Sequence, residues 1–192
     1  MNDQPIAAGK SSFDLIDFAK LVDVLDIEKG ITFLDVACGA GAYTLALADH
    51  VGPNGTLYAL DLWTEGIEMV SIEVKQREIN TIHAHEADVS RRMPLETGTV
   101  DLCLMATVLH DLIEDHTDQG TLQEVARVLK PGGKLAVIEF KKIDGPPGPP
   151  MGIRLSPEEA EAHLNPYAFE KRVTHDYGYP AYANTPTCHV FA

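Results

Sequence analysis

The sequence predicts an α/β fold in which a mostly parallel sheet is covered by helices on both faces. Segments with strand-like and helix-like spacing of apolar residues alternate along the chain, which is the pattern of parallel sheets with crossover helices. Residues 100–106 are apolar at nearly every position, as central parallel strands are. The length of 192 residues suits one domain, and 45% hydrophobic residues suit a folded core.

The first 140 residues contain most of the expected elements. A helix should follow Ser11 and Ser12, because Leu15, Phe18 and Val22 recur at helical spacing. Strands are expected, in order, over residues 32–37, 57–60, 82–87, 100–106 and 135–140. Helices are expected between them over residues 43–51, 64–78 and 121–129, the last of them ended by Pro131, Gly132 and Gly133.

The remaining residues begin with a different kind of segment. Residues 144–152 contain four prolines and three glycines, so we expect a stiff extended connection rather than a helix or a central strand. Ser156 is the expected N-cap of a following helix, with Pro157 in the first turn and Glu159 completing a capping box. Two strands near residues 169–174 and 188–191 would complete the sheet as an edge hairpin.

The charge and the cysteines exclude several classes of function. The formal net charge of −14, from 29 acidic and 15 basic residues, disfavours nucleic acid and anionic membranes as partners. The first nine residues do not resemble a signal peptide and no apolar stretch could span a bilayer, so a soluble, cytoplasmic protein is expected. Cys38, Cys103 and Cys188 are odd in number and widely spaced, which favours reduced thiols over disulfides or a zinc site.

The segment Leu34-Asp35-Val36-Ala37-Cys38-Gly39-Ala40-Gly41 lies where the first predicted strand leads into a helix. Small residues there let a ligand approach the backbone, at the edge where open α/β sheets bind ligands. Asp61 ends the second strand and can accept hydrogen bonds from both hydroxyls of a ribose. Asp88 ends the third strand and can accept from an adenine amino group. The three strand ends predict an adenosine site, the alternative being a glycine-rich turn that serves only the chain reversal.

This pattern resembles class I S-adenosylmethionine-dependent methyltransferases, most closely the ubiquinone/menaquinone C-methyltransferase-like group. The resemblance covers roughly residues 31–140, and Ala37 departs from it by replacing the family's usual first glycine with another small residue. It rests on five motifs in order: the segment just described, Leu60-Asp61, Ala87-Asp88-Val89, Asp101 to His110, and Leu129-Lys130-Pro131-Gly132-Gly133-Lys134-Leu135.

The resemblance implies a single Rossmann-like domain with seven strands in the order 3-2-1-4-5-7-6 and strand seven antiparallel. Residues 1–29 would be an N-terminal helical cap, residues 30–140 the cofactor-binding core, and residues 141–192 the Pro/Gly connection, a helix and the edge strands. S-adenosylmethionine would be the cofactor and S-adenosylhomocysteine the product. The residues expected to bind the cofactor are Asp35, Ala37, Cys38, Gly39, Gly41, Asp61, Leu62, Asp88, Val89 and Ala106.

Two other interpretations remain open at this point. An NAD(P)-dependent oxidoreductase would use a similar sheet, but its fingerprint needs a third small residue at position 44, which is Thr44 here. A non-catalytic adenosyl-binding or regulatory protein would carry the same cofactor motif, and the short C-terminal part favours it slightly.

Methyl transfer from a sulfonium is an in-line displacement, so it depends on alignment and needs a base only if the acceptor must lose a proton. His110, just after the fourth strand, is the candidate base, and the alternative is a histidine that merely starts a helix. No metal is predicted. Two groups could suggest one, but are expected to be a solvated acidic loop and an edge position: Glu114, Asp115 and His116, and His83 with His85.

Three segments remain to form an acceptor pocket: the N-terminal helix, residues 110–117 and residues 144–154. None is long enough to hold a macromolecule, so a small, partly apolar acceptor is expected. Phe13, Met151 and Ile153 are the expected walls, and Phe13 is also expected to close over the cofactor. The identity of the acceptor, the atom methylated and the oligomeric state stay open.

Overall fold

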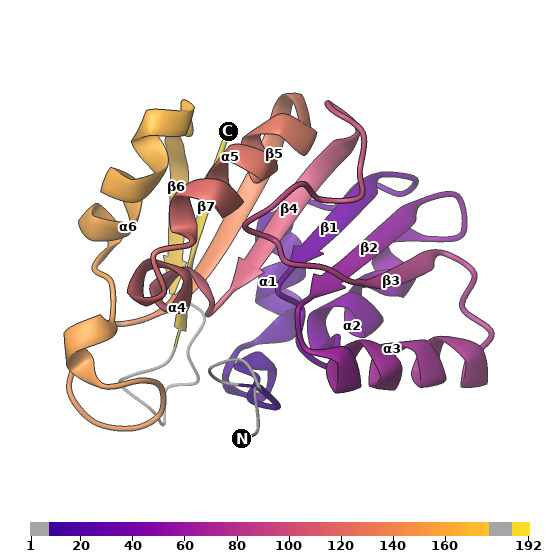
Figure 1. Cartoon of the computed structure of the whole chain (residues 1–192), viewed down its shortest axis with the longest axis horizontal. Coiled ribbons are helices and arrows are strands. Elements are labelled where there is room, and N and C mark those ends of the chain that lie inside the picture. The colour runs from indigo at the N-terminus through magenta and orange to yellow at the C-terminus, as the bar shows by residue number, and fades with distance from the viewer. Residues whose placement is uncertain (1–7, 177–185) are drawn as a thin grey trace.

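The computed structural model describes residues 8–176 and 186–192, and at its centre is a seven-stranded sheet (Figure 1). The strands follow the order β3-β2-β1-β4-β5-β7-β6. Strands β1 to β5 pair in parallel, while β7 runs antiparallel to both β5 and β6. This order confirms the predicted topology. The strands are β1 (Thr32–Val36), β2 (Thr56–Asp61), β3 (Ile82–Glu86), β4 (Val100–Ala106), β5 (Leu129–Phe140), β6 (Lys171–Asp176) and β7 (Pro186–Phe191).

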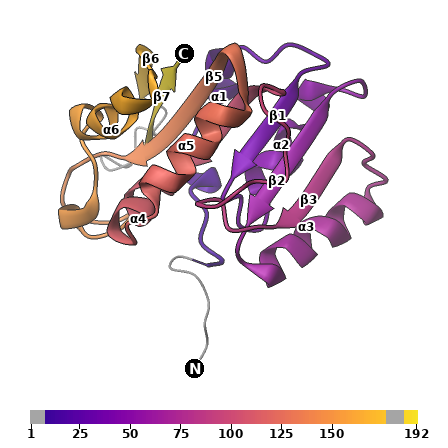
Figure 2. The same cartoon turned by 45° about the horizontal axis from the view of Figure 1, so that its top comes forward.

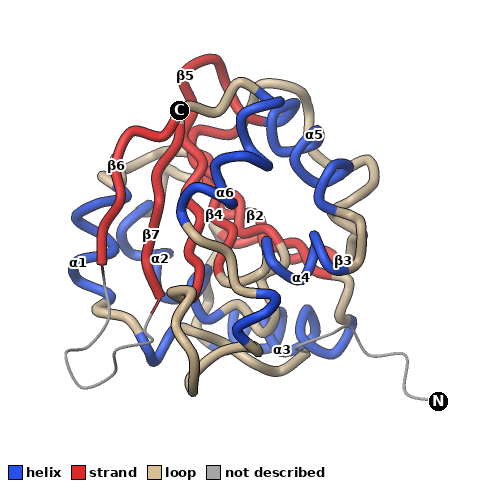
Figure 3. The backbone as a smooth tube through the Cα atoms, turned by 90° about the vertical axis from the view of Figure 1, so that its left-hand side faces the viewer, coloured by secondary structure: helices blue, strands red, loops and turns tan. Residues whose placement is uncertain are grey.

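Helices cover both faces of the sheet (Figures 2 and 3). Successive residues of a strand point to opposite faces, so each strand contributes to two cores. Leu34 and Val36 of β1 belong to the core under α4, α5 and α6, whereas Phe33 belongs to the core under α1, α2 and α3. The helices are α1 (Phe18–Leu25), α2 (Ala42–Val51), α3 (Thr64–Gln76), α4 (Leu109–Glu114), α5 (Asp118–Val128) and α6 (Pro157–Leu164).

The N-terminal segment differs from the single helix that its spacing predicts. Phe13–Leu15 form one 3-10 turn, Ile16 is extended, and α1 begins only at Phe18. The side chain of Asp17 caps α1 by accepting a hydrogen bond from the backbone N–H of Lys20 at 3.3 Å. Because an N-cap residue is itself non-helical, the helix cannot extend back through Asp17.

Two further elements differ from the prediction. Helix α4 occupies most of a segment expected to be a loop, because Leu109 is buried in the core and holds it against the sheet. Strand β5 begins at Leu129, so the Pro-Gly-Gly sequence lies inside the irregular start of a strand. The pairing with β4 shifts there, since the partners of Val100 and Leu102 are Leu129 and Lys134. Two steps along β4 thus correspond to five along β5, and the extra residues in this irregular pairing accommodate the turn-like sequence within the strand.

The C-terminal part follows the prediction more closely. Residues 144–150 form neither a helix nor a strand, as predicted, but they curl around Arg154 instead of running extended, because its guanidinium binds the carbonyls of Gly145, Pro147 and Pro149. A short 3-10 turn, Met151–Ile153, leads toward α6. Ser156 and Glu159 form the expected capping box: Ser156 Oγ accepts from the Glu159 N–H at 3.2 Å, and the Glu159 carboxylate accepts from the Ser156 N–H at 2.7 Å. Strands β6 and β7 form an antiparallel pair at the edge of the sheet, and residues 177–185 between them lie outside the described residues.

The state of the three cysteines agrees with the prediction of reduced thiols. Cys103 and Cys188 are buried in β4 and β7, Cys38 is half-buried, and all three are free thiols. Within residues 8–176 and 186–192, no helix is long and apolar enough to cross a membrane.

Candidate cofactor and acceptor site

The turn between β1 and α2 contains glycines with two different roles. Gly39 and Gly41 both have positive φ, +56° and +72°. A side chain at Gly41 would collide with Val70 of α3, because its Cβ would lie 2.5 Å from a Val70 methyl carbon. A Cβ at Gly39 would meet no heavy atom within 4 Å, and Gly39 lines a cavity. Gly41 therefore allows close helix packing, whereas Gly39 keeps space free for a ligand.

Asp61, at the end of β2, holds this turn in place. One carboxylate oxygen accepts from the Gly39 N–H at 2.6 Å, and the other accepts from the Trp63 N–H at 2.7 Å. A carboxylate has about four lone-pair positions, so two remain for a ligand's hydroxyl groups. The buried Asp61 thus joins the turns after two neighbouring strands and still keeps acceptor capacity.

Two other acids at the strand ends have partners within the protein. Asp35 is buried and accepts a hydrogen bond from Thr44 Oγ1 at 2.6 Å. Burial raises the pKa of Asp35 to about 7, although the Thr44 hydrogen bond opposes that change. Asp88 accepts from the N–H and the hydroxyl of Ser90, and its second oxygen forms an ion pair with Arg91 at 3.0 Å. In the sequence Thr44 is only a misfit to the dinucleotide fingerprint, whereas in the structure it is the hydrogen-bond partner of Asp35.

The predicted site residues meet around one cavity of about 850 Å³ at the carboxyl edge of the sheet. Gly41 does not line it and acts through helix packing. The residues from the predicted set that do line it are Asp35, Ala37, Cys38, Gly39, Asp61, Leu62, Asp88, Val89, Ala106 and His110.

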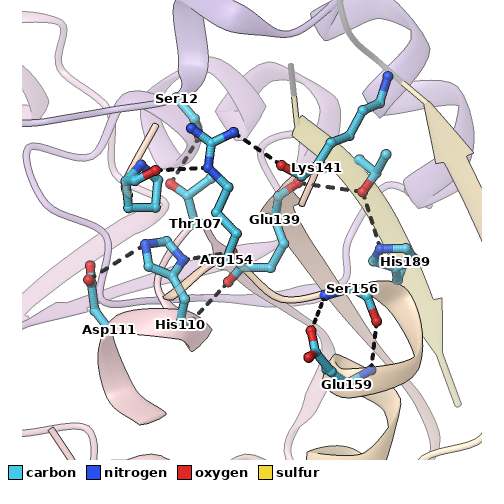
Figure 4. A network of polar contacts seen from close by, with 12 residues as sticks. Ser12, Thr107, His110, Asp111, Glu139, Lys141, Arg154, Ser156, Glu159 and His189 are labelled. Atoms are coloured by element: carbon cyan, nitrogen blue, oxygen red, sulfur yellow. Dashed lines mark hydrogen bonds and ion pairs between the residues drawn. The ribbon is translucent and has the colours of Figure 1, made fainter. Parts of the chain in front are cut away.

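His110 lines this cavity, at the end where an acceptor is expected, and is held by Glu139 of β5 (Figure 4). The imidazole Nδ1 lies 2.6 Å from Glu139 Oε2, and the His110 backbone N–H donates to Glu139 Oε1 at 3.2 Å. Nε2 lies 3.5 Å from a carboxylate oxygen of Asp111. Burial lowers the pKa of His110, but the hydrogen bond and charge of Glu139, with Asp111, outweigh it, so the pKa is raised overall.

Glu139 was not predicted, although its sequence context contains a signal. It stands inside Leu135-Ala136-Val137-Ile138-Glu139-Phe140, an otherwise apolar strand, and is 1% exposed. A buried carboxylate is costly unless it is hydrogen-bonded or paired. A charged residue in a central strand therefore indicates a partner elsewhere in the fold, which here is His110.

The expected acceptor walls are only partly right. Ile153 lines the cavity, but Phe13 and Met151 do not. Phe13 packs against Tyr43 and Phe18, with ring centroids 5.2 and 5.4 Å apart, so it does not close over the cavity. The N-terminal contribution comes instead from residues 8–12 and Leu15.

A polar network fixes this N-terminal segment. Ser12 Oγ lies 2.8 Å from the Tyr43 hydroxyl, and the Thr107 hydroxyl donates to Ser12 Oγ at 3.2 Å. Thr107 is 95 residues away in sequence, at the end of β4. The contact brings the start of the described chain to the wall of the cavity.

The two groups of histidines and acids that could suggest a metal site lie apart from this cavity or at its rim. Glu114, Asp115 and His116 are exposed, as a solvated loop would be, and Asp115 reaches the cavity. His83 and His85 are exposed on β3, at the edge of the sheet as expected. Among the described residues, no group of three His, Cys, Asp or Glu side chains could hold a metal ion.

The strand order, the glycine-containing turn and the acid after β2 define a class of α/β proteins that bind an adenosyl cofactor at the carboxyl edge of the sheet. This chain belongs to the methyltransferase domain family, which matches residues 34–137. It is 32% identical over 118 residues to a demethylmenaquinone methyltransferase of Geobacillus sp. (strain WCH70), covering 60% of this chain and 47% of that protein. The chain thus spans about half the length of the curated relatives it matches.

Solved structures with a similar fold match this chain over nearly its whole length. A SAM-dependent methyltransferase from Aquifex aeolicus has a TM-score of 0.80 and 27% identity, covering 97% of this chain and 93% of that one. The [4+2]-cyclase SpnF has a TM-score of 0.70 and 20% identity, covering 90% of this chain and 78% of that one, and so shares the fold.

These comparisons confirm the predicted resemblance to methyltransferases that use S-adenosylmethionine as the cofactor. The geometry fits that group, since Gly39 leaves open space beside the cavity and Asp61 keeps acceptor positions for a ribose. The family match gives no support to the NAD(P)-dependent oxidoreductase alternative.

Proposed function

We propose that this chain is an S-adenosylmethionine-dependent methyltransferase that acts on a small-molecule acceptor. The observation that carries the proposal is the continuous cavity that joins Gly39 and Asp61 to His110. Ligand pockets usually measure roughly 300–1,000 Å³. At about 850 Å³ this cavity is near the upper end, which is consistent with a cofactor and a small acceptor side by side.

The residues at the strand ends would hold the cofactor. Asp61 would accept from the ribose hydroxyls, Asp88 and Val89 would lie at the adenine, and the turn at Gly39 would face the methionine part. When bound, S-adenosylmethionine supplies a methyl group already activated by its sulfonium. The task left to this chain is to orient the acceptor and, where needed, to take its proton.

His110 is the candidate proton acceptor, and Glu139 would orient it. With the Nδ1 proton directed at Glu139, Nε2 is left to receive a proton from the acceptor. The raised pKa makes the imidazole a stronger base, active at pH values above that pKa. A well-placed general base contributes about 10²- to 10⁴-fold to a rate.

The walls favour a compact, partly apolar acceptor. Leu15, Phe140, Pro147 and Ile153 contribute apolar surface to the cavity that His110 also lines. The net charge of −14 disfavours nucleic acid. The similar proteins named demethylmenaquinone methyltransferases suggest a hydroquinone as the first acceptor to test.

Binding and turnover should be measured separately, because the fold also occurs in a [4+2]-cyclase. Trp63 is the single tryptophan and lines the cavity, so its fluorescence can report the binding of S-adenosylhomocysteine against NAD. Transfer of a labelled methyl group should then be measured to a naphthohydroquinone, a catechol, a thiophenol and an aromatic amine. Binding of NAD alone would refute the proposal. Binding of S-adenosylhomocysteine with no transfer would favour the non-catalytic alternative.

A further inference from the structure

Arg154 is a buried arginine whose hydrogen bonds all go to one segment of backbone. It is 2% exposed, and each of its five N–H groups donates to a carbonyl oxygen of the Pro/Gly connection. Figure 4 shows the side chain reaching back toward Lys141. The acceptors are alternate residues, at distances of 2.6–3.1 Å: Lys141, Ile143, Gly145, Pro147 and Pro149.

This arrangement needs a guanidinium. Among the described residues no carboxylate forms an ion pair with Arg154, so carbonyl dipoles surround its charge. A lysine ammonium has three donors on one atom and could not reach five carbonyls spread along nine residues. Residues 142–146 are exposed and belong to neither core. The hydrogen bonds from Arg154, rather than the burial of apolar side chains, therefore hold this segment in its conformation.

The segment curled around Arg154 forms one wall of the cavity. Pro147, Gly148, Pro149 and Pro150 all line it, whereas Arg154 does not. Gly148 has φ +102°, and a Cβ there would come within 2.7 Å of the Phe140 ring.

Phe140 lies between the cavity and the guanidinium of Arg154. It lines the cavity itself, and the Arg154 guanidinium carbon lies 5.8 Å from the centre of its ring. The wall is thus fixed between an aromatic ring and a buried cation, and Arg154 contacts the cavity lining through Phe140 and through the carbonyls of Pro147 and Pro149.

We propose that Arg154 is a positioning residue that fixes this wall and so determines which acceptors fit the cavity. The inference rests on the proposed function for the existence of an acceptor. Arg154 donates its hydrogen bonds to backbone carbonyls. Among the described residues, none of these hydrogen bonds goes to His110 or to a residue at the cofactor end. Its replacement should change acceptor selection while cofactor affinity stays the same.

The test compares Arg154→Lys with Arg127→Lys as a matched control. Arg127 also donates to backbone carbonyls, those of Met93 and Leu95, and pairs with Glu124, but none of these residues lines the cavity. Both substitutions keep the charge and remove carbonyl hydrogen bonds of a similar kind. They differ in whether the loss falls on the wall of the cavity.

Three quantities should be measured in both variants: the rate of tryptic cleavage after Lys141 and Lys142, the Kd of S-adenosylhomocysteine, and the kcat/KM ratio between a monocyclic and a bicyclic hydroquinone. In Arg154→Lys we expect cleavage to accelerate at least tenfold and the ratio to change by about tenfold or more, since small misplacements have large kinetic effects. The Kd should stay within twofold. Arg127→Lys should leave the cleavage rate and the ratio unchanged.

Equal cleavage rates in the two variants, or an unchanged acceptor ratio in Arg154→Lys, would overturn the proposal. If Arg154→Lys does not fold, Gly148→Ala disturbs the same wall from the Phe140 side and should change the same ratio. A wild type that methylates no acceptor would overturn the proposed function, and with it the role in acceptor choice. The cleavage rates and the Kd would then show separately whether Arg154 fixes the segment.

Discussion

The two ends of the cavity are built in different ways. At the cofactor end, Gly39, Asp61 and Asp88 each lie at, or within three residues of, the end of their own strand. At the acceptor end, His110 depends on Glu139, 29 residues later, and Ser12 bonds to Thr107, 95 residues later. Each residue of the first end can therefore be located from its own strand, although Asp61 also binds Gly39, 22 residues away, whereas the second end depends on contacts between more distant segments.

The largest expected effect concerns the cofactor end. Gly39→Val should abolish S-adenosylhomocysteine binding while the protein stays folded, because the side chain would occupy the space beside the cavity, where a Cβ meets no heavy atom within 4 Å, although φ of +56° makes the substitution strained. The measurement is calorimetry, with circular dichroism to check the fold. A matched control is Gly98→Val, since Gly98 also has positive φ and open space but does not line the cavity. Normal binding by Gly39→Val would show that the turn is not at the cofactor.

The next effect tests the acceptor end. His110→Asn should lower kcat about 100-fold or more once an acceptor is known, with S-adenosylhomocysteine affinity within twofold. His163→Asn is the matched control, because His163 pairs with Asp118 at 2.9 Å away from the cavity. Intact turnover in His110→Asn would reduce the histidine to a structural role and would leave the acceptor end without a base.

A smaller effect should follow the loss of the carboxylate that would accept hydrogen bonds from the ribose. Asp61→Ala should weaken S-adenosylhomocysteine binding by about 10- to 100-fold, because hydrogen bonds to a charged group contribute about 1.5–3 kcal/mol. Asp101→Ala is the control: Asp101 also accepts a backbone N–H, from Thr32 at 2.8 Å, but does not line the cavity. If both variants bound equally well, Asp61 would have no part in cofactor binding.

The smallest expected effect refines the role of Glu139. In Glu139→Gln the imidazole of His110 should lose its proton at lower pH than in the wild type, because the charge of Glu139 no longer opposes the effect of burial and only that of Asp111 remains. NMR titration of the ring measures this without any acceptor. Because the pKa of His110 is raised in the folded state, the protonated imidazole stabilises the fold at pH values below the usual pKa of 6.5. This contribution is lost as the pH rises through the raised pKa. The variant's deficit in unfolding free energy should therefore be larger at pH 6 than at pH 9, and an unchanged titration would contradict the pairing.

The sequence alone was sufficient for the sheet and most of the cofactor end. Apolar runs located most strands within a few residues, although β5 begins six residues before its predicted start, and Asp35, Gly39, Asp61 and Asp88 were selected from their places at or near strand ends. This works because the carboxyl ends of neighbouring parallel strands must meet at the same edge. The N-terminal segment was harder, since Asp17 interrupts a helical pattern by capping within it.

Only the tertiary structure decided the acceptor end. Nothing in the spacing of residues pairs His110 with Glu139, or directs Phe13 away from the cavity toward Tyr43. Arg154 looks like an ordinary surface charge in the sequence and becomes the centre of a wall only when the Pro/Gly connection curls around it. The physical reason is that buried polar groups must find partners, and the fold rather than the local sequence determines which partners come within reach.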